Sequence, residues 1–321
     1  MLLPEIRKDY IQDKYVIIAP IRKNRPQDIE KIKPERPMLK KECVFCLPQI
    51  NKIKDYLTIN DSGGQGWDVK VIPNKYPAVS IDFPKAYGLQ DIVIETPDHT
   101  LELEDLSADH IAKILKAYAL RTQEISKDKK IEYILIFKNN GGRAGASIQH
   151  AHSQIFATAF LPPNLLDKSQ KTQAYKLEHG LCIYCEVINK ERGGPRWIFE
   201  DEHVVCFAPY ASMHHYETWI MTKRHTDNIT QLTDEERLAF AGILKHIIKK
   251  ICLLGLPYNF YFHQVINDED QHLYMKVIPR GNIWAGVEIG SGLIINPIPP
   301  EDAAEFYRKG LKYTPLRQGA G

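Results

Sequence analysis

The chain has 321 residues, enough for two domains with hydrophobic cores of their own. Its formal net charge is only +2, so no acidic polymer is required as a partner. No apolar run reaches the length of a membrane span, and charges appear by Arg7 without the apolar segment of a secretory signal. We therefore expect a cytoplasmic protein with neither a membrane nor a nucleic-acid partner.

The N-terminal segment is locally basic and leads to a cysteine pair. Arg22 and Arg25 lie close together in the sequence. Basic residues clustered in this way usually form a solvated face and less often belong to a phosphate-binding site. Cys43 and Cys46 then form a C-x-x-C pair. In a large chain without a secretion signal, this spacing favours a metal site over a disulfide.

A regular series of elements follows the first cysteine pair. Ser107 precedes apolar residues at helical spacing, which predicts a capped helix, while alternating or apolar runs predict strands. In chain order these are the segment 69–80, a strand within 91–100 that leads to His99, a helix over 108–125, a strand within 131–142 and a strand that contains His150.

The second half of the chain repeats this order. Cys182 and Cys185 form another C-x-x-C pair, and Thr233 caps another helix. The later segments are 203–212, a strand within 216–226 that contains His225, a helix over 232–251, a strand within 259–267 and a strand that begins near His272. A repeat of this length indicates one supersecondary unit used twice.

The repeat predicts the fold class and the domain division. We expect an α+β chain of two tandem domains, each a mainly antiparallel sheet with packed helices. The boundary is expected in the polar, proline-bearing stretch 162–173, which divides the chain into residues 1–168 and 169–321.

Each half offers two cysteines and two histidines, a set that suits tetrahedral zinc. The first site would consist of Cys43, Cys46, His99 and His150, and the second of Cys182, Cys185, His225 and His272. His263 is a competing ligand for the second site. We expect two zinc ions per chain; the alternative is that these histidines are ordinary residues at strand ends.

The two halves differ on their last strands. Strict alternation places three polar residues on one face in each half: His150, His152 and Gln154 in the first, and His272, Tyr274 and Lys276 in the second. Only the first half keeps a second imidazole, so we expect one reactive centre per chain.

The chemistry expected at that centre follows from the side chains. If His150 binds the metal, His152 is left to attack phosphorus as a neutral imidazole. Gln154 can hydrogen-bond a phosphoryl oxygen but cannot act as an acid or base. Glycines at 141, 142 and 145 allow the backbone to approach a phosphate closely. These residues favour nucleotidyl transfer between phosphates over hydrolysis.

Several motifs together carry a resemblance to a known family. They are RKNRP near the start, the C-x-x-C pair, VIPNKYPA, TPDH, FKNNGGRAGAS, HAHSQ and EIGSGLIINPIPPEDAAE. The chain resembles the galactose-1-phosphate uridylyltransferase family, within the histidine-triad superfamily, whose mark is His-Pro-His-x-Gln. Three features are similar to those of the ADP-glucose phosphorylase branch: the alanine in place of that proline, the double C-x-x-C and the C-terminal segment.

The resemblance implies a ping-pong reaction. A nucleotide sugar would give its nucleotidyl group to His152 and leave as a sugar 1-phosphate, and a second sugar 1-phosphate or inorganic phosphate would then take the nucleotide. Residues 1–168 would be the nucleotidyl-transfer domain, and residues 169–321 a degenerate repeat that binds metal and contacts the sugar. The family also implies a homodimer.

The resemblance also assigns binding roles by position. Gln154 would hold the α-phosphoryl group, which Asn139 and Ser147 would contact as well. The remaining assignments are Arg22, Arg25 and Asn74 to the nucleotide and Glu288 to the sugar hydroxyls. The residue before Glu288 is Val287, where the family has a tyrosine, and this weakens galactose as the sugar. In some members of the family the second metal site uses a His-x-His pair on the C-terminal strand, which residues 276–278 lack here. The second site is therefore expected to use its cysteines as ligands.

Three other functions stay open from the sequence. The leading expectation is a hexose-1-phosphate nucleotidylyltransferase of the UDP-glucose–hexose-1-phosphate uridylyltransferase type. The first alternative is an ADP-glucose phosphorylase, which would transfer adenylyl to phosphate. A histidine-triad nucleotide hydrolase is a second alternative, although Gln154 replaces its third histidine. A zinc-stabilised nucleotide-binding protein without activity is the third.

Overall fold

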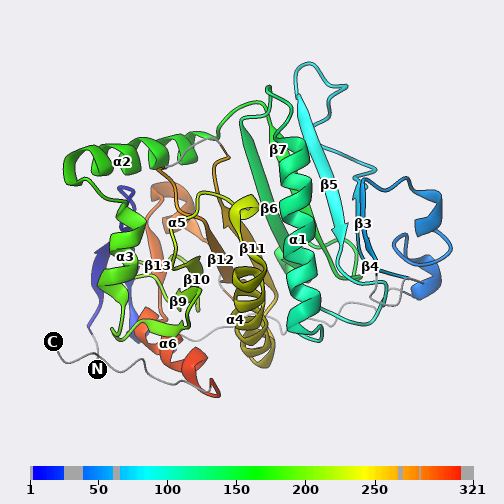
Figure 1. Ribbon diagram of the computed structural model, residues 1–321. Helices are drawn as coiled ribbons and strands as arrows, with labels where there is room; N and C mark the ends of the chain where they lie inside the picture. Colours follow the sequence, from blue (N-terminus) through cyan, green and yellow to red (C-terminus); the bar gives the residue numbers. More distant parts are fainter. Residues whose placement is uncertain (1–2, 25–38, 61–65, 267–269, 282, 312–321) are drawn as a thin grey trace.

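A computed structural model describes residues 3–24, 39–60, 66–266, 270–281 and 283–311. Two helices lie side by side across one face of a large sheet: α1 (Ala108–Ile125) and α4 (Asp234–Leu253) (Figure 1). Both begin where their caps predict. The Ser107 side chain accepts from the His110 N–H, and Thr233 forms a capping box with Glu236.

Among the described residues, the large sheet has ten strands in the order β3-β4-β5-β7-β6-β11-β12-β10-β9-β8, and all neighbouring strands in it are antiparallel. The strands of the first half are β3 (Leu57–Asn60), β4 (Trp67–Pro73), β5 (Gly88–Ile94), β6 (Tyr133–Asn140) and β7 (His152–Thr158). Those of the second half are β8 (Trp197–Glu200), β9 (Val204–Phe207), β10 (Thr218–Thr222), β11 (Tyr258–His263) and β12 (Tyr274–Pro279).

The order of strands confirms the repeat. From the centre outward the halves read β6-β7-β5-β4-β3 and β11-β12-β10-β9-β8, and β6 pairs with β11 to join them edge to edge. The α+β prediction is confirmed. The predicted division at 168/169 falls inside α2 (Pro163–His179), and the two domains stay a prediction.

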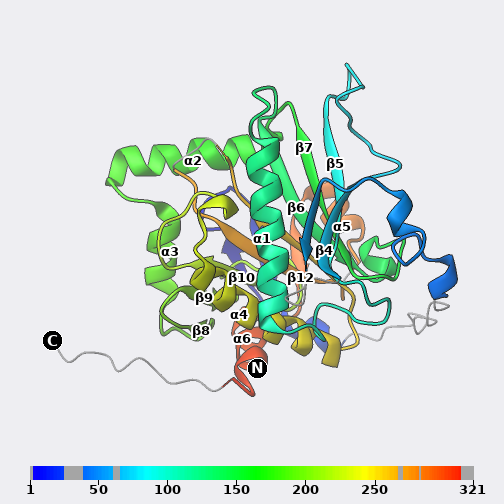
Figure 2. The ribbon, with the colours of Figure 1, turned by 45° about the vertical axis from the view of Figure 1, so that its right-hand side comes forward.

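The core lies beneath α1 and α4. In β7, Ile155 and Ala157 belong to the hydrophobic cluster that these helices cover. Since successive side chains in a strand point to opposite faces, His152 and Gln154 face the other side. There the first half carries the segment with Cys43 and Cys46, and Figure 2 shows the chain of residues 39–56, which precedes β3, to one side of β4.

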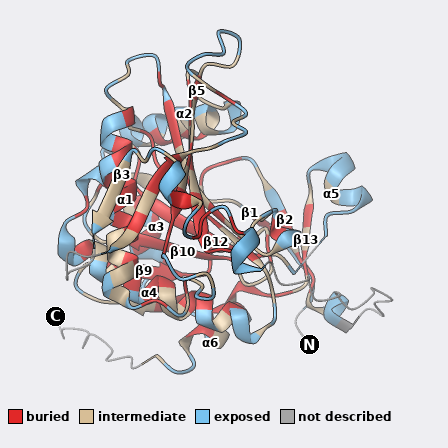
Figure 3. Ribbon diagram, turned by 90° about the vertical axis from the view of Figure 1, so that its right-hand side faces the viewer, coloured by how far each residue is buried: buried red, intermediate tan, exposed pale blue. Residues whose placement is uncertain are grey.

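The remaining elements cover the second half and its edge. They are α3 (Ile183–Glu191), α5 (Gly286–Ser291), α6 (Pro300–Arg308) and a small sheet of β1 (Glu5–Lys8), β2 (Tyr15–Ile18) and β13 (Ile294–Asn296). α5 is exposed and projects from the body of the molecule near the small sheet (Figure 3). Within the described ranges, no helix has the length and apolar character needed to cross a membrane.

Candidate functional site

The structure brings the four ligands predicted for the first metal site into one cluster. The ligand atoms of Cys43, Cys46, His99 and His150 all lie within 4.8 Å of one another. Cys46 Sγ is 3.4 Å from His99 Nδ1 and 3.5 Å from His150 Nδ1. Zinc–sulfur and zinc–nitrogen bonds of ordinary length at tetrahedral angles would place S and N roughly 3.5 Å apart. The donor set and its spacing therefore fit a tetrahedral zinc ion.

A backbone carbonyl orients His150 for this role. The Nε2–H of His150 donates to the carbonyl of Thr96 at 2.7 Å, which directs Nδ1 at the cluster. Thr96 follows β5, and His99 comes three residues later. The segment after this strand therefore supplies one ligand, His99, and the carbonyl that orients another, His150. Burial lowers the pKa of His150, which favours the neutral ring that binds metal.

The second predicted metal site forms in the same way. Cys182, Cys185, His225 and His272 have ligand atoms within 4.8 Å of one another, and Cys185 Sγ is 3.5 Å from both His225 Nδ1 and His272 Nδ1. His272 Nε2 lies 2.9 Å from the carbonyl of Thr222, the same support that His150 receives. The competing His263 is outside this cluster, and its Nε2 lies 3.1 Å from Tyr184 Oη.

His152 begins β7, two residues beyond His150, which itself precedes the strand. Its Nδ1 lies 2.8 Å from the carbonyl of His150. Because a carbonyl only accepts, Nδ1 carries the proton and Nε2 keeps the lone pair. The residue is 7% exposed, and burial together with the charge of Lys138 lowers the pKa of its imidazole. A buried neutral ring with a fixed tautomer suits a nucleophile.

A cavity of about 390 Å³ lies in front of this histidine. Of the predicted site residues, Asn139, Ser147, His150 and His152 line it; the other described lining residues are Glu102, Lys138, Asn140, Gly141, Gly142, Ala146, Ile148 and Gln149. The loop at its rim needs two glycines, because the φ angles at 141 and 145 are +85° and +94°.

Two residues that the sequence did not single out support the site. Asn259 of β11 donates to Asn139 Oδ1 at 2.7 Å and to the carbonyl of Ala144 at 2.8 Å, so the second half holds the glycine loop. Gln90 of β5 donates to Gln154 Oε1 at 2.9 Å. This bond occupies the carbonyl of the Gln154 amide and orients its NH₂ group away from Gln90.

The other predicted residues lie apart from the lining of this cavity in the described part of the chain. Asn74 follows β4, and its main-chain N–H donates to the carbonyl of Gln90 at 3.0 Å. Arg22 is in the short helix Pro20–Asn24. Arg25 lies outside the described residues.

Glu288 is in α5 and lies near Arg22. The Ala285 N–H donates to the Glu288 carboxylate at 2.9 Å. Burial alone would raise the pKa of this carboxyl group, but the backbone N–H groups and the charge of Arg22 more than offset it and lower the pKa. The charge of Arg22, the predicted nucleotide arginine, thus acts on Glu288, the predicted sugar glutamate, and both residues belong to segments that flank the small sheet.

Comparison with known proteins gives consistent relatives. A family model described as "Galactose-1-phosphate uridyl transferase, N-terminal domain" matches residues 2–162. The chain is 33% identical to an ADP-glucose phosphorylase of Arabidopsis thaliana over 95% of this chain and 93% of the relative. It is 29% identical to a galactose-1-phosphate uridylyltransferase of Thermotoga maritima over 95% of this chain and 98% of the relative.

Solved structures agree with the sequence matches. The crystal structure of an ADP-glucose phosphorylase from Arabidopsis thaliana with bound ADP-glucose superimposes with a TM-score of 0.83 at 32% identity, covering 95% of this chain and 99% of that one. A uridylyltransferase structure gives a TM-score of 0.71 at 28% identity, covering 95% and 97%.

Proposed function

The chain belongs to the galactose-1-phosphate uridylyltransferase family of nucleotidyltransferases, and from this premise we propose a ping-pong transfer through a covalent intermediate on His152. The observation that carries the proposal is the single tautomer of a buried imidazole. The His152 Nδ1–H donates a hydrogen bond to the His150 carbonyl, so Nε2 keeps the lone pair that is needed for attack on phosphorus. The substrates proposed are a nucleotide sugar and a hexose 1-phosphate or inorganic phosphate.

The two steps balance without an external acid or base. In the first, His152 Nε2 attacks the α-phosphorus; a P–N bond forms, the P–O bond to the sugar phosphate breaks, and its oxygen keeps the electron pair. In the second, an oxygen of the acceptor phosphate attacks the same phosphorus; a P–O bond forms, the P–N bond breaks, and its electron pair returns to Nε2. Gln154 is proposed to donate hydrogen bonds from its NH₂ group to the phosphoryl oxygens, which Asn139 at the end of β6 and Ser147 in the following loop are proposed to contact as well.

The two Cys₂His₂ clusters are proposed to hold one zinc ion each. With four protein ligands, such an ion is structural and fixes the segments that carry its ligands. In the first half these include His150, whose carbonyl receives the His152 Nδ1–H. Arg22, Arg25, Asn74 and Glu288 keep their proposed substrate-binding roles.

Adenylyl transfer is the second candidate, and one observation favours it. The relative with 33% identity and the structure with the TM-score of 0.83 are both ADP-glucose phosphorylases. Uridylyl transfer between hexose 1-phosphates uses the same His152 chemistry. The choice depends on the base and the acceptor, so the experiment must vary both.

The test uses intact-mass spectrometry. The protein is mixed with UDP-glucose or with ADP-glucose, and the expected result is an adduct of uridylyl or adenylyl mass on His152. Galactose 1-phosphate or inorganic phosphate is then added, and the acceptor that discharges the adduct identifies the reaction. His152→Ala should give no adduct while retaining its metal. Activity that survives in His152→Ala would contradict the mechanism, and release of mononucleotide over many turnovers without an acceptor would favour the hydrolase.

The domain roles and the oligomeric state are proposed on family grounds. Residues 1–168 are proposed as the nucleotidyl-transfer domain and residues 169–321 as the degenerate, metal-binding and sugar-contacting repeat. A homodimer is expected, and light scattering on the purified protein would detect it. A monomer at every concentration tested would contradict that expectation.

A further inference from the structure

A buried ion pair lies where strands β6 and β7 separate. Lys138 Nζ is 2.7 Å from Glu95 Oε2, and the two side chains are 1% and 0% exposed. Burial by itself lowers the pKa of Lys138, but Glu95 and Glu102 more than offset it, so the pKa is raised and the lysine stays charged. Desolvation cancels much of the attraction in such a pair, which makes it a poor source of stability alone. Its location is more informative.

The pair sits at a break in the sheet. The ladder between β6 and β7 runs from Tyr133 opposite Thr158 to Phe137 opposite Gln154 and stops there. On the other side, the ladder between β5 and β7 continues to His152. Beyond Gln154, the β6 strand and the loop before His152 form walls of the catalytic cavity. His152 therefore has a ladder partner on one side only.

Lys138 supplies the missing partner. The carbonyl of Ala151 accepts from the Glu95 N–H at 3.1 Å, on the β5 side. Because the backbone groups of successive residues in a strand face opposite sides, the His152 carbonyl faces β6. There it accepts from Lys138 Nζ at 3.2 Å. The Glu95 carboxylate pairs with that ammonium, and the Glu95 main-chain N–H donates to Ala151. Hydrogen bonds therefore fix the start of β7 on both of its edges.

We propose that Lys138 and Glu95 are positioning residues for the nucleophile: they fix the main chain of His152 at the point where the sheet opens into the cavity. The inference rests on the proposed function of His152. A side chain that attacks phosphorus must be held near its line of attack, and a displacement of about 1 Å can cost on the order of 100-fold in rate. An ordinary ladder bond would hold the main chain but would close the sheet and remove the cavity.

The second half of the chain gives an internal comparison. Its ladder between β11 and β12 continues through Phe262 opposite Met275 to His263 opposite Tyr274, so that sheet does not open. Phe262 is the counterpart of Lys138 in this ladder. It comes directly after the pair Tyr261–Lys276, and Lys138 comes directly after the corresponding pair Phe137–Gln154. Ile94 lies opposite His152 and Met221 lies opposite Tyr274, so the next residue in each half is Glu95 in the first and Thr222 in the second. The half that lacks the second imidazole therefore has an apolar residue in place of Lys138 and an uncharged threonine in place of Glu95.

The experiment compares two double variants of the full chain. Lys138→Met with Glu95→Gln removes the pair without leaving an unpaired buried charge. The matched control is Arg121→Met with Asp91→Asn, which removes another buried ion pair of the first half, between α1 and β5, 2.7 Å long with side chains 6% and 2% exposed. For each protein we would measure metal content, the affinity for the nucleotide sugar and the single-turnover rate of adduct formation on His152.

The expected result separates rate from binding. The Lys138/Glu95 variant should form the adduct about 10- to 100-fold more slowly, with wild-type metal content and little change in affinity, whereas the control variant should match wild type in all three. A rate equal to that of the control, or a loss explained by missing metal or weaker binding, overturns the proposal. If the double variant does not fold, Glu95→Gln alone is held to the same criteria. Absence of any adduct on wild type would instead refute the proposed function, and the positioning role with it.

Discussion

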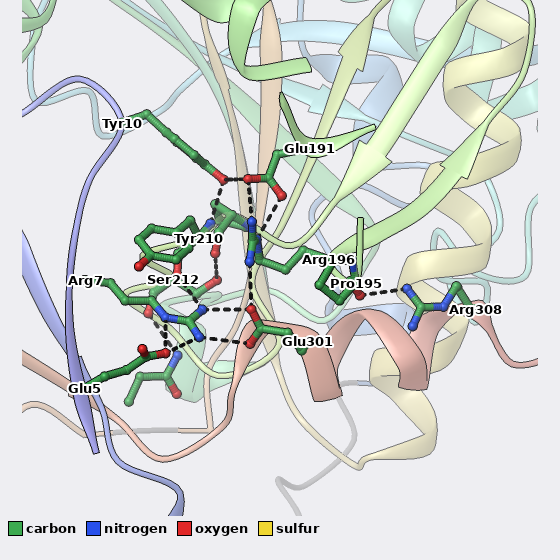
Figure 4. Close-up of polar contacts among 12 residues, drawn as sticks. Glu5, Arg7, Tyr10, Glu191, Pro195, Arg196, Tyr210, Ser212, Glu301 and Arg308 are labelled. Atoms are coloured by element: carbon green, nitrogen blue, oxygen red, sulfur yellow. Dashed lines mark hydrogen bonds and ion pairs between the residues drawn. The ribbon is translucent and has the colours of Figure 1, made fainter. Parts of the chain in front are cut away.

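Glu301 joins two arginines that tie the small sheet to the second half of the chain. It lies in the first turn of α6, and its Oε1 accepts from Arg7 Nη1 at 3.0 Å and from Arg196 Nη1 at 2.8 Å, while its Oε2 accepts from Arg7 Nη2 at 3.3 Å. Arg196 also bonds Glu191 through two nitrogens, and Tyr10 donates to the same carboxylate (Figure 4). We predict that Glu301→Gln weakens this network.

The size of the effect follows from the contacts. Glutamine keeps the shape and one oxygen acceptor, but it loses the negative charge and turns an NH₂ group toward guanidinium donors. A hydrogen bond to a charged group contributes about 1.5–3 kcal/mol, and more than one is weakened here. The Glu301 side chain is 26% exposed, so solvent screening reduces the loss. We expect the free energy of unfolding to fall by about 2 kcal/mol.

Equilibrium urea unfolding, followed by circular dichroism, measures this change. The matched control is Glu305→Gln on the same helix, whose partner Lys309 is 3.4 Å away with both side chains mostly exposed. The control should leave the unfolding midpoint unchanged. An equal shift for the two variants, or none for Glu301→Gln, would refute the reasoning. Because β2 leads to Arg22 and β13 follows Glu288, the variant should also weaken nucleotide-sugar binding.

Three other changes have defined outcomes. Cys43→Ser and Cys182→Ser should each remove about one metal equivalent per chain by elemental analysis, and a double variant both. Gly141→Ala should lower the unfolding free energy by roughly 1–3 kcal/mol in urea titrations, because φ is +85° and a Cβ would lie 2.9 Å from Pro257 Cβ. Burial lowers the pKa of Lys168 to about 8, so the folded protein releases this proton before the unfolded chain does. Stability should therefore rise by up to about 3 kcal/mol between pH 8 and 10.5, a rise that Lys168→Met should lack in unfolding measured across that range.

Local signals in the sequence were sufficient for the helices α1 and α4 and for the ligand clusters. Ser107 and Thr233 define the starts of α1 and α4 because a cap bonds N–H groups only three residues away. The ligand sets could be read because the same order of cysteines and histidines occurs twice. A duplicated pattern thus gives tertiary information that a single pattern would not.

Long-range pairings could not be read in this way. Nothing in the alternation of β6 or β11 says that these strands pair with each other, because the period of two is the same for every neighbour. The stretch 162–173, expected as a domain boundary, lies largely in α2. The Lys138–Glu95 pair left one weak signal, a charged residue within or directly after an apolar strand segment, but 43 positions separate the two residues and only the fold shows that they meet.

The comparison of the two halves separates what the metal clusters require from what the reaction requires. Both halves place two cysteines and two histidines together, and both orient the last histidine through a threonine carbonyl. The cluster is therefore a property of the repeat and does not by itself make a half reactive. At the position of His152 the second half has Tyr274, fully buried, with its hydroxyl 2.6 Å from Lys168 Nζ. Its ladder is closed at that level, whereas the first half opens and fills the gap with a charged pair. We therefore propose that reactivity in this fold depends on interrupting the sheet beside a strand whose main chain is fixed, and that the ion pair allows both conditions to be met at His152.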